Sequence, residues 1–141
     1  MLAAPLVACM TLAGTLNGLP PLLLPAIHML EGGQIGTVAT NKNGSQDFGV
    51  MQINSSWLPV LARGLGRTEA EIRAGLINDG CFNIQIAGAV MKYNLAQAHG
   101  DLWTAVGYYS SHTPSWNAIY QARVAIAAIK LQAGTVSERA K

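Results

Sequence analysis

Charged residues are scarce in this sequence. Only 11% of its 141 residues are Asp, Glu, Lys or Arg, and the formal net charge is +2. The sequence also lacks a basic stripe, the cysteine and histidine spacing of a zinc site, and a glycine-rich phosphate loop. These absences argue against nucleic acid, a structural metal and a nucleotide as partners.

A long uninterrupted hydrophobic run is missing too, although half of the residues are hydrophobic. A membrane-spanning helix needs about twenty consecutive, mostly apolar residues. The longest uncharged stretch, residues 1–30, is instead broken by Pro5, Gly14, Gly18, Pro20, Pro21 and Pro25. We therefore expect no stable membrane span, and this length favours one domain with a substantial core.

Cysteine is limited to Cys9 and Cys81. In an exported protein the two would form one disulfide that closes a long loop and stabilises the fold by roughly 2–4 kcal/mol. Two buried free thiols are the alternative. Residues 1–8 are apolar and small, like the end of a secretory leader, but they lack its positive n-region. We interpret them as a leader remnant or a cloning junction, and "LVAC" also matches a lipoprotein cleavage box.

The rest of the chain predicts helices joined by loops, with an irregular segment over residues 34–54. Prolines open a helix that ends at Glu31 before two glycines, and Pro25 must lie in its first turn. Further helices are expected over residues 10–17, from Ser55 or Ser56 to 63, from Thr68, from Asn78 or Asp79 to 98, from Asp101, and from Pro114 or Ser115, the last with Ile119, Ala122, Ile126 and Ile129 inward. This is an all-α class with a minor β excursion. The domain spans residues 9–134 and a polar tail covers 135–141.

Carboxylates are few enough to be considered one by one. Helix starts explain Glu69, Glu71, Asp79 and Asp101, and Glu138 lies in the tail, which leaves Glu31 and Asp47. Glu31 closes an apolar helix, where both desolvation and the negative end of the helix dipole raise a carboxyl pKa. A carboxyl that stays protonated near neutral pH can act as a general acid. An exposed glutamate at a helix end is the alternative.

The segment "GSQDFGVMQINSSW", residues 44–57, mixes amides with apolar side chains. In extended structure Gln52 and Asn54 share one face, and Met51 and Ile53 share the other. Amides suit sugar hydroxyls because each offers a donor and an acceptor. The strip is therefore predicted to pack on the core with one side and to line a cleft for a hydroxyl-rich ligand with the other. A hairpin with solvated amides would alternate in the same way.

Four motifs carry a family resemblance: "HMLEGG", "NKNGSQDFGVMQINSSW", "DGCFNIQIAGAVM" and "AVGYYSS". In this order they resemble the goose-lysozyme-related lytic transglycosylase domain over about residues 9–130. The small stand-alone type that accompanies type IV secretion, conjugation and pilus machines is the most similar. The resemblance implies a single lysozyme-fold domain, an exported and periplasmic protein, and a disulfide between Cys9 and Cys81.

The same resemblance implies roles for particular residues. Glu31 would be the single catalytic acid/base. Gly49, Met51 and Gln52 would form the cleft wall, and Thr40 or Ser45 would supply a small hydroxyl. Tyr109 would hydrogen-bond the catalytic carboxyl, with Ser110 where many members have asparagine. With Asn54 from the strip, the expected substrate-binding residues are Gly49, Met51, Gln52, Asn54, Tyr109 and Ser110.

The reaction implied is cleavage of the β-1,4 bond between N-acetylmuramic acid and N-acetylglucosamine in peptidoglycan, with a 1,6-anhydro product and no metal or cofactor. Peptidoglycan glycan strands are the expected partner, together with components of a secretion, conjugation or pilus machine. Two alternatives remain open. Asp47 also resembles the second carboxylate of animal-type lysozymes, which would give a hydrolase, and an inactive peptidoglycan-binding module is the other.

Conspicuous aromatic residues and histidines have simpler interpretations. We expect Trp57 and Trp103 in the core, and Trp116 either there or as a sugar-stacking face. His28 precedes Glu31 by one helical turn but lacks a third metal ligand nearby, so core packing is favoured over metal binding. His112 is a candidate for contact with substrate at the cleft mouth.

Overall fold

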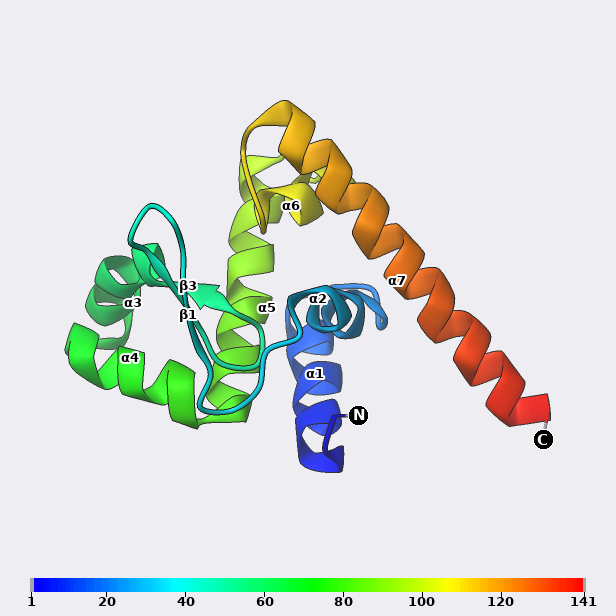
Figure 1. Ribbon diagram of the computed structural model, residues 1–141, viewed down its shortest axis with the longest axis horizontal. Coiled ribbons are helices and arrows are strands. Elements are labelled where there is room, and N and C mark those ends of the chain that lie inside the picture. Colours follow the sequence, from blue (N-terminus) through cyan, green and yellow to red (C-terminus); the bar gives the residue numbers. More distant parts are fainter. Residues whose placement is uncertain (1, 141) are drawn as a thin grey trace.

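The computed structural model describes residues 2–140, with side chains described to residue 134. Over this range the chain forms seven α-helices, one 3₁₀ turn and a small antiparallel sheet (Figure 1). The α-helices are α1 (Ala4–Leu16), α2 (Leu23–Glu31), α3 (Leu58–Leu65), α4 (Glu69–Asn78), α5 (Gly80–Gln97), α6 (Leu102–Tyr108) and α7 (Pro114–Ala140). The strands are β1 (Val38–Thr40), β2 (Gln46–Phe48) and β3 (Ile53–Asn54), and the 3₁₀ turn is Ser55–Trp57.

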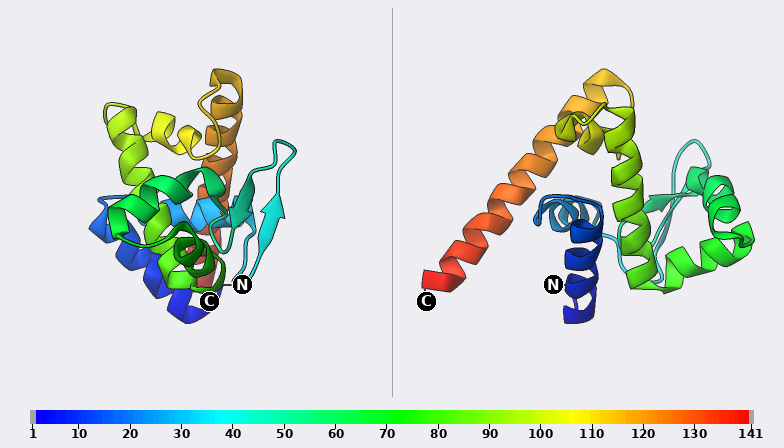
Figure 2. Two further views of the ribbon diagram at one scale, coloured as in Figure 1. Left: turned by 90° about the vertical axis from the view of Figure 1, so that its left-hand side faces the viewer. Right: turned by 180° about the vertical axis from the view of Figure 1, so that it is seen from behind.

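Helix α5 forms the centre of the arrangement. The sheet, α3 and α4 lie on one side of it, and α1 and α2 lie between α5 and α7 on the other (Figures 1 and 2). Ile84, Ala87 and Met91, which share one side of α5, are completely buried. A Cβ on Gly88 would lie 2.7 Å from Asn17 Nδ2 and 3.3 Å from Ala13 Cβ. Glycine at this position therefore lets α1 pack closely on α5, which explains its place inside a helix.

Helix starts follow the predicted capping chemistry in most cases. Thr68 forms a capping box with Glu71, and Asp79 and Asp101 accept hydrogen bonds from the backbone N–H groups of Phe82 and Thr104. The exception is the cap expected at Ser55 or Ser56. Asn54 Oδ1 accepts from Ser56 N instead, while Ser55 Oγ accepts from Gln46 N at 3.0 Å. An Asx turn thus opens the 3₁₀ turn that precedes α3.

The minor β excursion is confirmed, and its register brings two polar residues together. Strand β2 pairs with both neighbours, and Asp47 lies opposite Ala39 on one side and Asn54 on the other. Helix α2 ends nearby. Gly32 adopts a left-handed conformation and donates its N–H to the His28 carbonyl, which ends the helix at Glu31 as expected.

Helix α7 faces the domain with the opposite side from the one predicted. Ile119, Ala122, Ile126 and Ile129 are exposed, and the buried residues are Asn117, Tyr120, Val124 and Ala127. Hydrophobicity alone selected the isoleucine stripe, but the inward face uses polar groups. Asn117 Nδ2 donates to the carbonyls of Thr104 and Ser111. The core prediction for Trp103 is also wrong, because this residue of α6 is 43% exposed.

The predicted disulfide is present between Cys9 of α1 and Cys81 of α5, with a Cα–Cα distance of 5.5 Å. Helix α1 begins at Ala4, so residues 4–8 and Cys9 belong to one helix, and α7 continues through Ala140. The assignments of residues 1–8, 9–134 and 135–141 stay predictions, and residues 1 and 141 lie outside the described range. Within that range, no helix has the length and hydropathy to span a membrane.

Candidate active site

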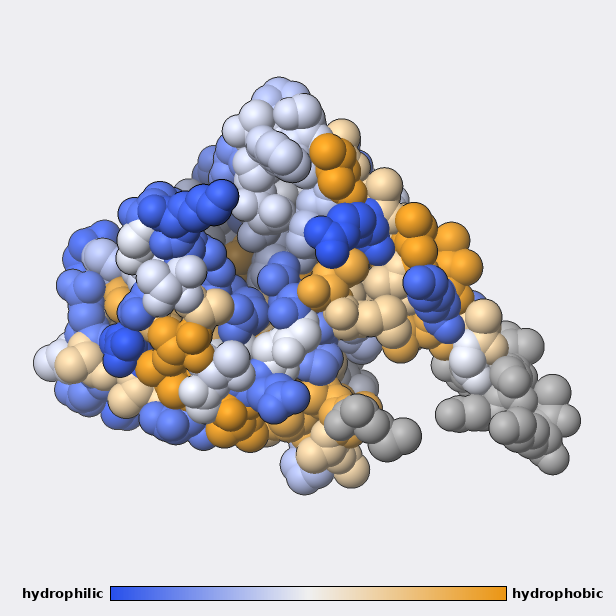
Figure 3. Space-filling model, viewed as in Figure 1, coloured by the Kyte–Doolittle hydropathy of each residue, from blue (hydrophilic) through white to orange (hydrophobic). Residues whose placement is uncertain are grey.

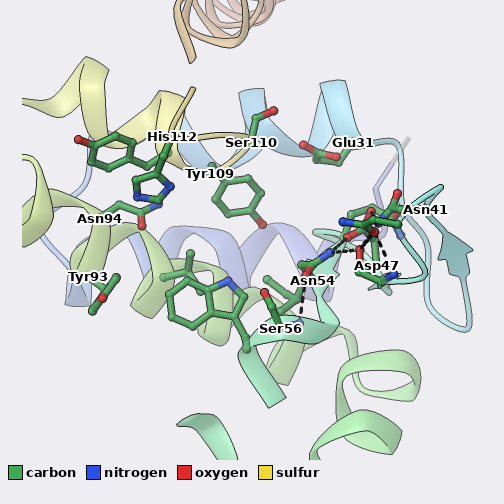
Figure 4. Close-up of a pocket in the computed structure, with 17 residues that line it drawn as sticks. Glu31, Asn41, Asp47, Asn54, Ser56, Tyr93, Asn94, Tyr109, Ser110 and His112 are labelled. Atoms are coloured by element: carbon green, nitrogen blue, oxygen red, sulfur yellow. Dashed lines mark hydrogen bonds between the residues drawn. The ribbon is translucent and has the colours of Figure 1, made fainter. Parts of the chain in front are cut away.

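A cleft of about 560 Å³ lies between α2, the sheet, α5 and the segment that follows α6 (Figure 4). Most of its lining residues are polar. They are Glu31, Asn41, Asn43, Ser45, Asp47, Gln52, Ile53, Asn54, Ser56, Trp57, Val90, Tyr93, Asn94, Tyr108, Tyr109, Ser110 and His112. Of the predicted substrate-binding residues, Gln52, Asn54, Tyr109 and Ser110 therefore line the cleft together with Glu31 and Asp47.

Glu31 is partly buried at the C-terminal end of α2. Burial raises the pKa of its carboxyl above the ordinary value. A hydrogen bond from the Tyr120 hydroxyl to Glu31 Oε1, 2.7 Å long, and the Arg123 charge act to lower that pKa, while the negative charge of Asp47 raises it further. The net pKa is raised, which favours the protonated carboxyl that a general acid requires.

The tyrosine that binds Glu31 is Tyr120 of α7, so the expectation that Tyr109 would do so is wrong. Tyr109 lies at the end of α6, and its hydroxyl donates to the Met51 carbonyl at 2.7 Å. The rings of the two tyrosines are nearly parallel, with centroids 6.5 Å apart. Burial raises the pKa of both tyrosines, so both hydroxyls keep their protons and act as donors. The signal in the sequence that could have indicated Tyr120 is its position three residues after Asn117, on the same polar side of the helix.

The amide strip is divided between core and cleft as predicted. Met51 and Ile53 are buried, Gln52 and Asn54 line the cleft, and Ile53 also contributes to the cleft wall. The backbone is not extended throughout, however, since Gln52 has φ 53° and closes a turn with its N–H bonded to the Gly49 carbonyl. A turn and a short strand thus reproduce the alternation expected of a longer strand.

Gly49 and Met51 lie beneath the cleft wall and do not line the cleft. Gly49 has φ 67°, and a Cβ there would collide with the Leu76 carbonyl and the Asn83 side chain. Met51 is fully buried, and its N–H donates to Asn83 Oδ1 at 2.8 Å. A Cβ on Gly33 would meet the Gly49 and Val50 carbonyls, so the chain after Glu31 also packs directly on this turn. These contacts position Gln52 and Glu31.

Asp47 is held by side-chain amides. Asn41 Nδ2 donates to its Oδ2 at 3.0 Å, and Asn54 Nδ2 donates to its Oδ1 at 2.8 Å. Both amides also reach Ser45 Oγ, which therefore occupies the cleft, whereas Thr40 on β1 does not line it. Asn41 was not among the residues singled out from the sequence. The asparagines in "NKNGS" were the signal for it.

Aromatic residues and histidines complete the rim. His112 stacks on Tyr108 with centroids 4.1 Å apart, and the rings of Trp57 and Tyr93 form a T-shaped pair. Trp57 therefore lies in the cleft wall as well as against the core. Trp116 is 63% exposed and lies outside the cleft. His28 Nε2 lies 3.1 Å from the Gly33 carbonyl, and no group of three potential metal ligands occurs among the described residues.

A helical domain with a small sheet, and with a partly buried glutamate over a polar cleft, is a lysozyme-like domain. The chain belongs to the Transglycosylase SLT domain family, whose model matches residues 9–123. This membership supports a transglycosylase-like function at the level of the family.

Three proteins illustrate the similarity. The chain is 32% identical over 111 residues to a peptidoglycan-binding-like protein of Escherichia coli O157:H7, covering 74% of this chain and 64% of that protein. It is 34% identical over 106 residues to protein IpgF of Shigella flexneri, with coverages of 74% and 66%. It is 35% identical over 78 residues to invasion protein IagB of Salmonella typhimurium, with coverages of 55% and 45%. The chain thus spans less than two thirds of the length of each relative.

Proposed function

We propose that this protein is a peptidoglycan lytic transglycosylase that cleaves the β-1,4 bond between N-acetylmuramic acid and N-acetylglucosamine. The observation that carries the proposal is the carboxyl of Glu31, with its raised pKa, at a cleft lined by amides and hydroxyls. Family membership supports the reaction class. Gln52, Asn54 and Ser110 supply donors and acceptors that suit acetamido and hydroxyl groups of a glycan.

Glu31 acts twice in the proposed reaction. Its proton first goes to the glycosidic oxygen as the bond to the anomeric carbon breaks. The resulting carboxylate then takes the proton of the muramoyl 6-hydroxyl, whose oxygen bonds to the anomeric carbon. The sum is a 1,6-anhydro ring and a free sugar hydroxyl, with no water consumed. Tyr120 holds Glu31 in place through both steps by donating to Oε1.

The proposed setting is the periplasm. The relatives include a protein named for invasion and another named for peptidoglycan binding. A role in opening the cell wall locally for a secretion, conjugation or pilus apparatus fits a small wall-cleaving domain. We propose it for this chain on that basis.

Hydrolysis with Asp47 as the second carboxylate is the other candidate, because Asp47 lines the same cleft and its charge raises the Glu31 pKa. We favour transglycosylation because both Asp47 oxygens already accept amide hydrogen bonds that brace the sheet. An inactive wall-binding module is the third possibility, and the presence of Glu31 in the cleft speaks against it.

Product analysis distinguishes these functions. Purified sacculi digested by the protein should release muropeptides with anhydro ends, as measured by mass spectrometry, and reducing ends heavier by one water would refute the proposal. Glu31→Gln should abolish clearing of sacculi while leaving sedimentation with them intact. Asp47→Asn should retain the anhydro product, whereas a hydrolase that uses Asp47 would lose its activity.

A further inference from the structure

Helix α7 has two apolar faces, and only one of them packs against the domain. Val124 is fully buried, and Ile126, two residues later, is 53% exposed. Two residues correspond to about 200° around an α-helix. The buried face of α7 packs on α2 and α6, and the opposite face points away from the domain.

We call this opposite side the outer face and define it by Ile119, Ile126 and Ile129. These three side chains are 51%, 53% and 68% exposed. Ala122, between the first two isoleucines, and Ala133, beyond the last, are exposed as well and add no polar group. Figure 3 shows apolar residues following one another along α7. Large β-branched side chains repeated along one exposed helix face indicate a binding surface more than chance exposure.

The charges around the outer face are all of one sign over the described side chains. No Asp or Glu occurs between Asp101 and Glu138. Arg123 and Lys130 are exposed and, by helical spacing, lie beside the isoleucines. The ion pair among the described residues joins Arg67 and Glu71, so neither Arg123 nor Lys130 forms an ion pair there, although the charge of Arg123 also acts on Glu31.

These charges discriminate between two occupants. If a second copy paired through the outer face, Arg123 and Lys130 of both copies would lie beside the interface. Residues 114–134 contain no carboxylate, so neither helix could neutralise these cations over that range. Three isoleucines also offer much less area than the roughly 800 Å² per partner that a stable interface buries. An anionic lipid surface satisfies both features, because it takes up apolar side chains and attracts the flanking cations.

We propose that the outer face of α7 binds an anionic lipid surface, with the isoleucines entering the interface and Arg123 and Lys130 contacting the headgroups. Tyr120, which holds Glu31, is on the buried face of the same helix. Docking through the outer face therefore turns the catalytic cleft away from the lipid. This orientation, though not the binding itself, rests on the proposed function, because it would present the cleft to a cell wall beyond the membrane.

Vesicle flotation tests the proposal with the full chain. The protein should float with vesicles of equal parts phosphatidylglycerol and phosphatidylcholine, and not with phosphatidylcholine alone. Ile126→Glu and Ile129→Glu should each lower the bound fraction about tenfold or more, since each removes a buried aliphatic side chain from the complex. Lys130→Gln should weaken binding in dilute buffer and less so at high salt.

Matched controls are Val60→Glu and Leu65→Glu on α3, which are 48% and 49% exposed and lie on another part of the domain. Both should bind the anionic vesicles like the parent. Equal binding by the Ile126→Glu and Ile129→Glu variants, or no flotation of the parent, would overturn the proposal. So would a parent dimer, seen by sedimentation velocity without lipid, that these variants abolish, because a second copy would then be the occupant.

The readout is independent of wall cleavage. Circular dichroism checks that each variant is folded, and clearing of lipid-free sacculi by Ile129→Glu should match the parent. If the protein floats with anionic vesicles but does not clear sacculi, lipid binding is supported and the proposed enzyme activity is refuted. If it clears sacculi but does not float, the enzyme activity is supported and lipid binding is refuted.

Discussion

Glu31 is under opposing influences, and each can be removed separately. Burial and the charge of Asp47 raise its pKa, while the Tyr120 hydroxyl and Arg123 lower it. Tyr120 belongs to α7, whereas Glu31 ends α2. The protonation of the proposed catalytic group therefore depends on a contact between elements 89 residues apart in sequence.

Tyr120→Phe tests this contact. Without the hydroxyl the ionised carboxylate loses a donor, so the Glu31 pKa should rise further and the pH profile of sacculus clearing should shift to higher pH. Loss of a hydrogen bond to a charged group corresponds to about a tenfold or larger drop in rate at neutral pH. Tyr109→Phe is the control, because its hydroxyl bonds the Met51 carbonyl. An unshifted profile for Tyr120→Phe would contradict this role.

Glu31→Gln should also change the pH dependence of stability. A carboxyl whose pKa is raised on folding stabilises the native state at low pH and loses that contribution as the pH rises through the raised value. Gln cannot ionise but still accepts from Tyr120. The melting temperature of the variant should therefore exceed that of the parent at neutral pH, and the difference should shrink below pH 4.5, the ordinary pKa. A constant difference across this range would mean that Glu31 ionises as freely as in water.

At the scale of elements, the turn from Gly49 to Gln52 positions the amide strip. It is held from below by Asn83 of α5 and crossed by the backbone after α2. Its geometry leaves no room for a side chain at Gly49, and the left-handed φ of 67° adds a second reason for glycine there.

Gly49→Ala should destabilise the protein by about 1–3 kcal/mol or more, because the new methyl group collides with the Leu76 carbonyl and the Asn83 side chain. Urea unfolding followed by circular dichroism measures this loss. Gly44→Ala is the matched control, since Gly44 has φ 85° with nothing within 4 Å of the added Cβ. It should cost only the backbone strain, about 1 kcal/mol. Equal losses for both variants would show that the contacts at Gly49 are unimportant.

Element boundaries were predictable where local chemistry decides them, and helix orientation was not. Caps at Thr68, Asp79 and Asp101 depend on neighbouring backbone and were found from the sequence. The face that α7 buries depends on α6 and the loop before α7, whose carbonyls require the Asn117 amide. A periodic isoleucine stripe gives no information about that requirement, so the wrong face was predicted.

At the scale of the molecule, the disulfide closes a segment that contains the whole amide strip. Cys9 and Cys81 are 72 residues apart, and Glu31, Asp47 and Gln52 lie between them. Most of the candidate site thus belongs to one covalent loop, and Tyr109 and Tyr120 come from outside it.

The free energy of unfolding of the double variant Cys9→Ser, Cys81→Ser should be lower than that of the parent by roughly 2–4 kcal/mol, because the disulfide restricts the unfolded chain. The helices should still form, since α1 also packs on α5 through Ala13 and Gly88. Thermal melts with and without reductant measure the effect. A reductant response that persists in the double variant would show that the effect has another source.

The candidate site divides in the same way between what the sequence could and could not predict. Glu31, Gln52 and Asn54 lie within one stretch of the sequence. There, an apolar context for Glu31 and the alternation of polar and apolar residues around the two amides were enough to predict their roles. Tyr120 reaches Glu31 from α7, and Tyr93 lines the cleft from α5. Their arrival depends on how the helices cross, which no local pattern in the chain encodes.

Asn83 has a consequence for how this architecture tolerates change. Its buried amide accepts from the Met51 N–H and donates to the carbonyls of Phe48 and Leu76. One side chain therefore fixes the turn at Gly49–Met51 between α4 and α5. Insertions in the loop that joins β1 and β2 would lengthen the groove wall while leaving this turn, and Gln52 beside it, in place.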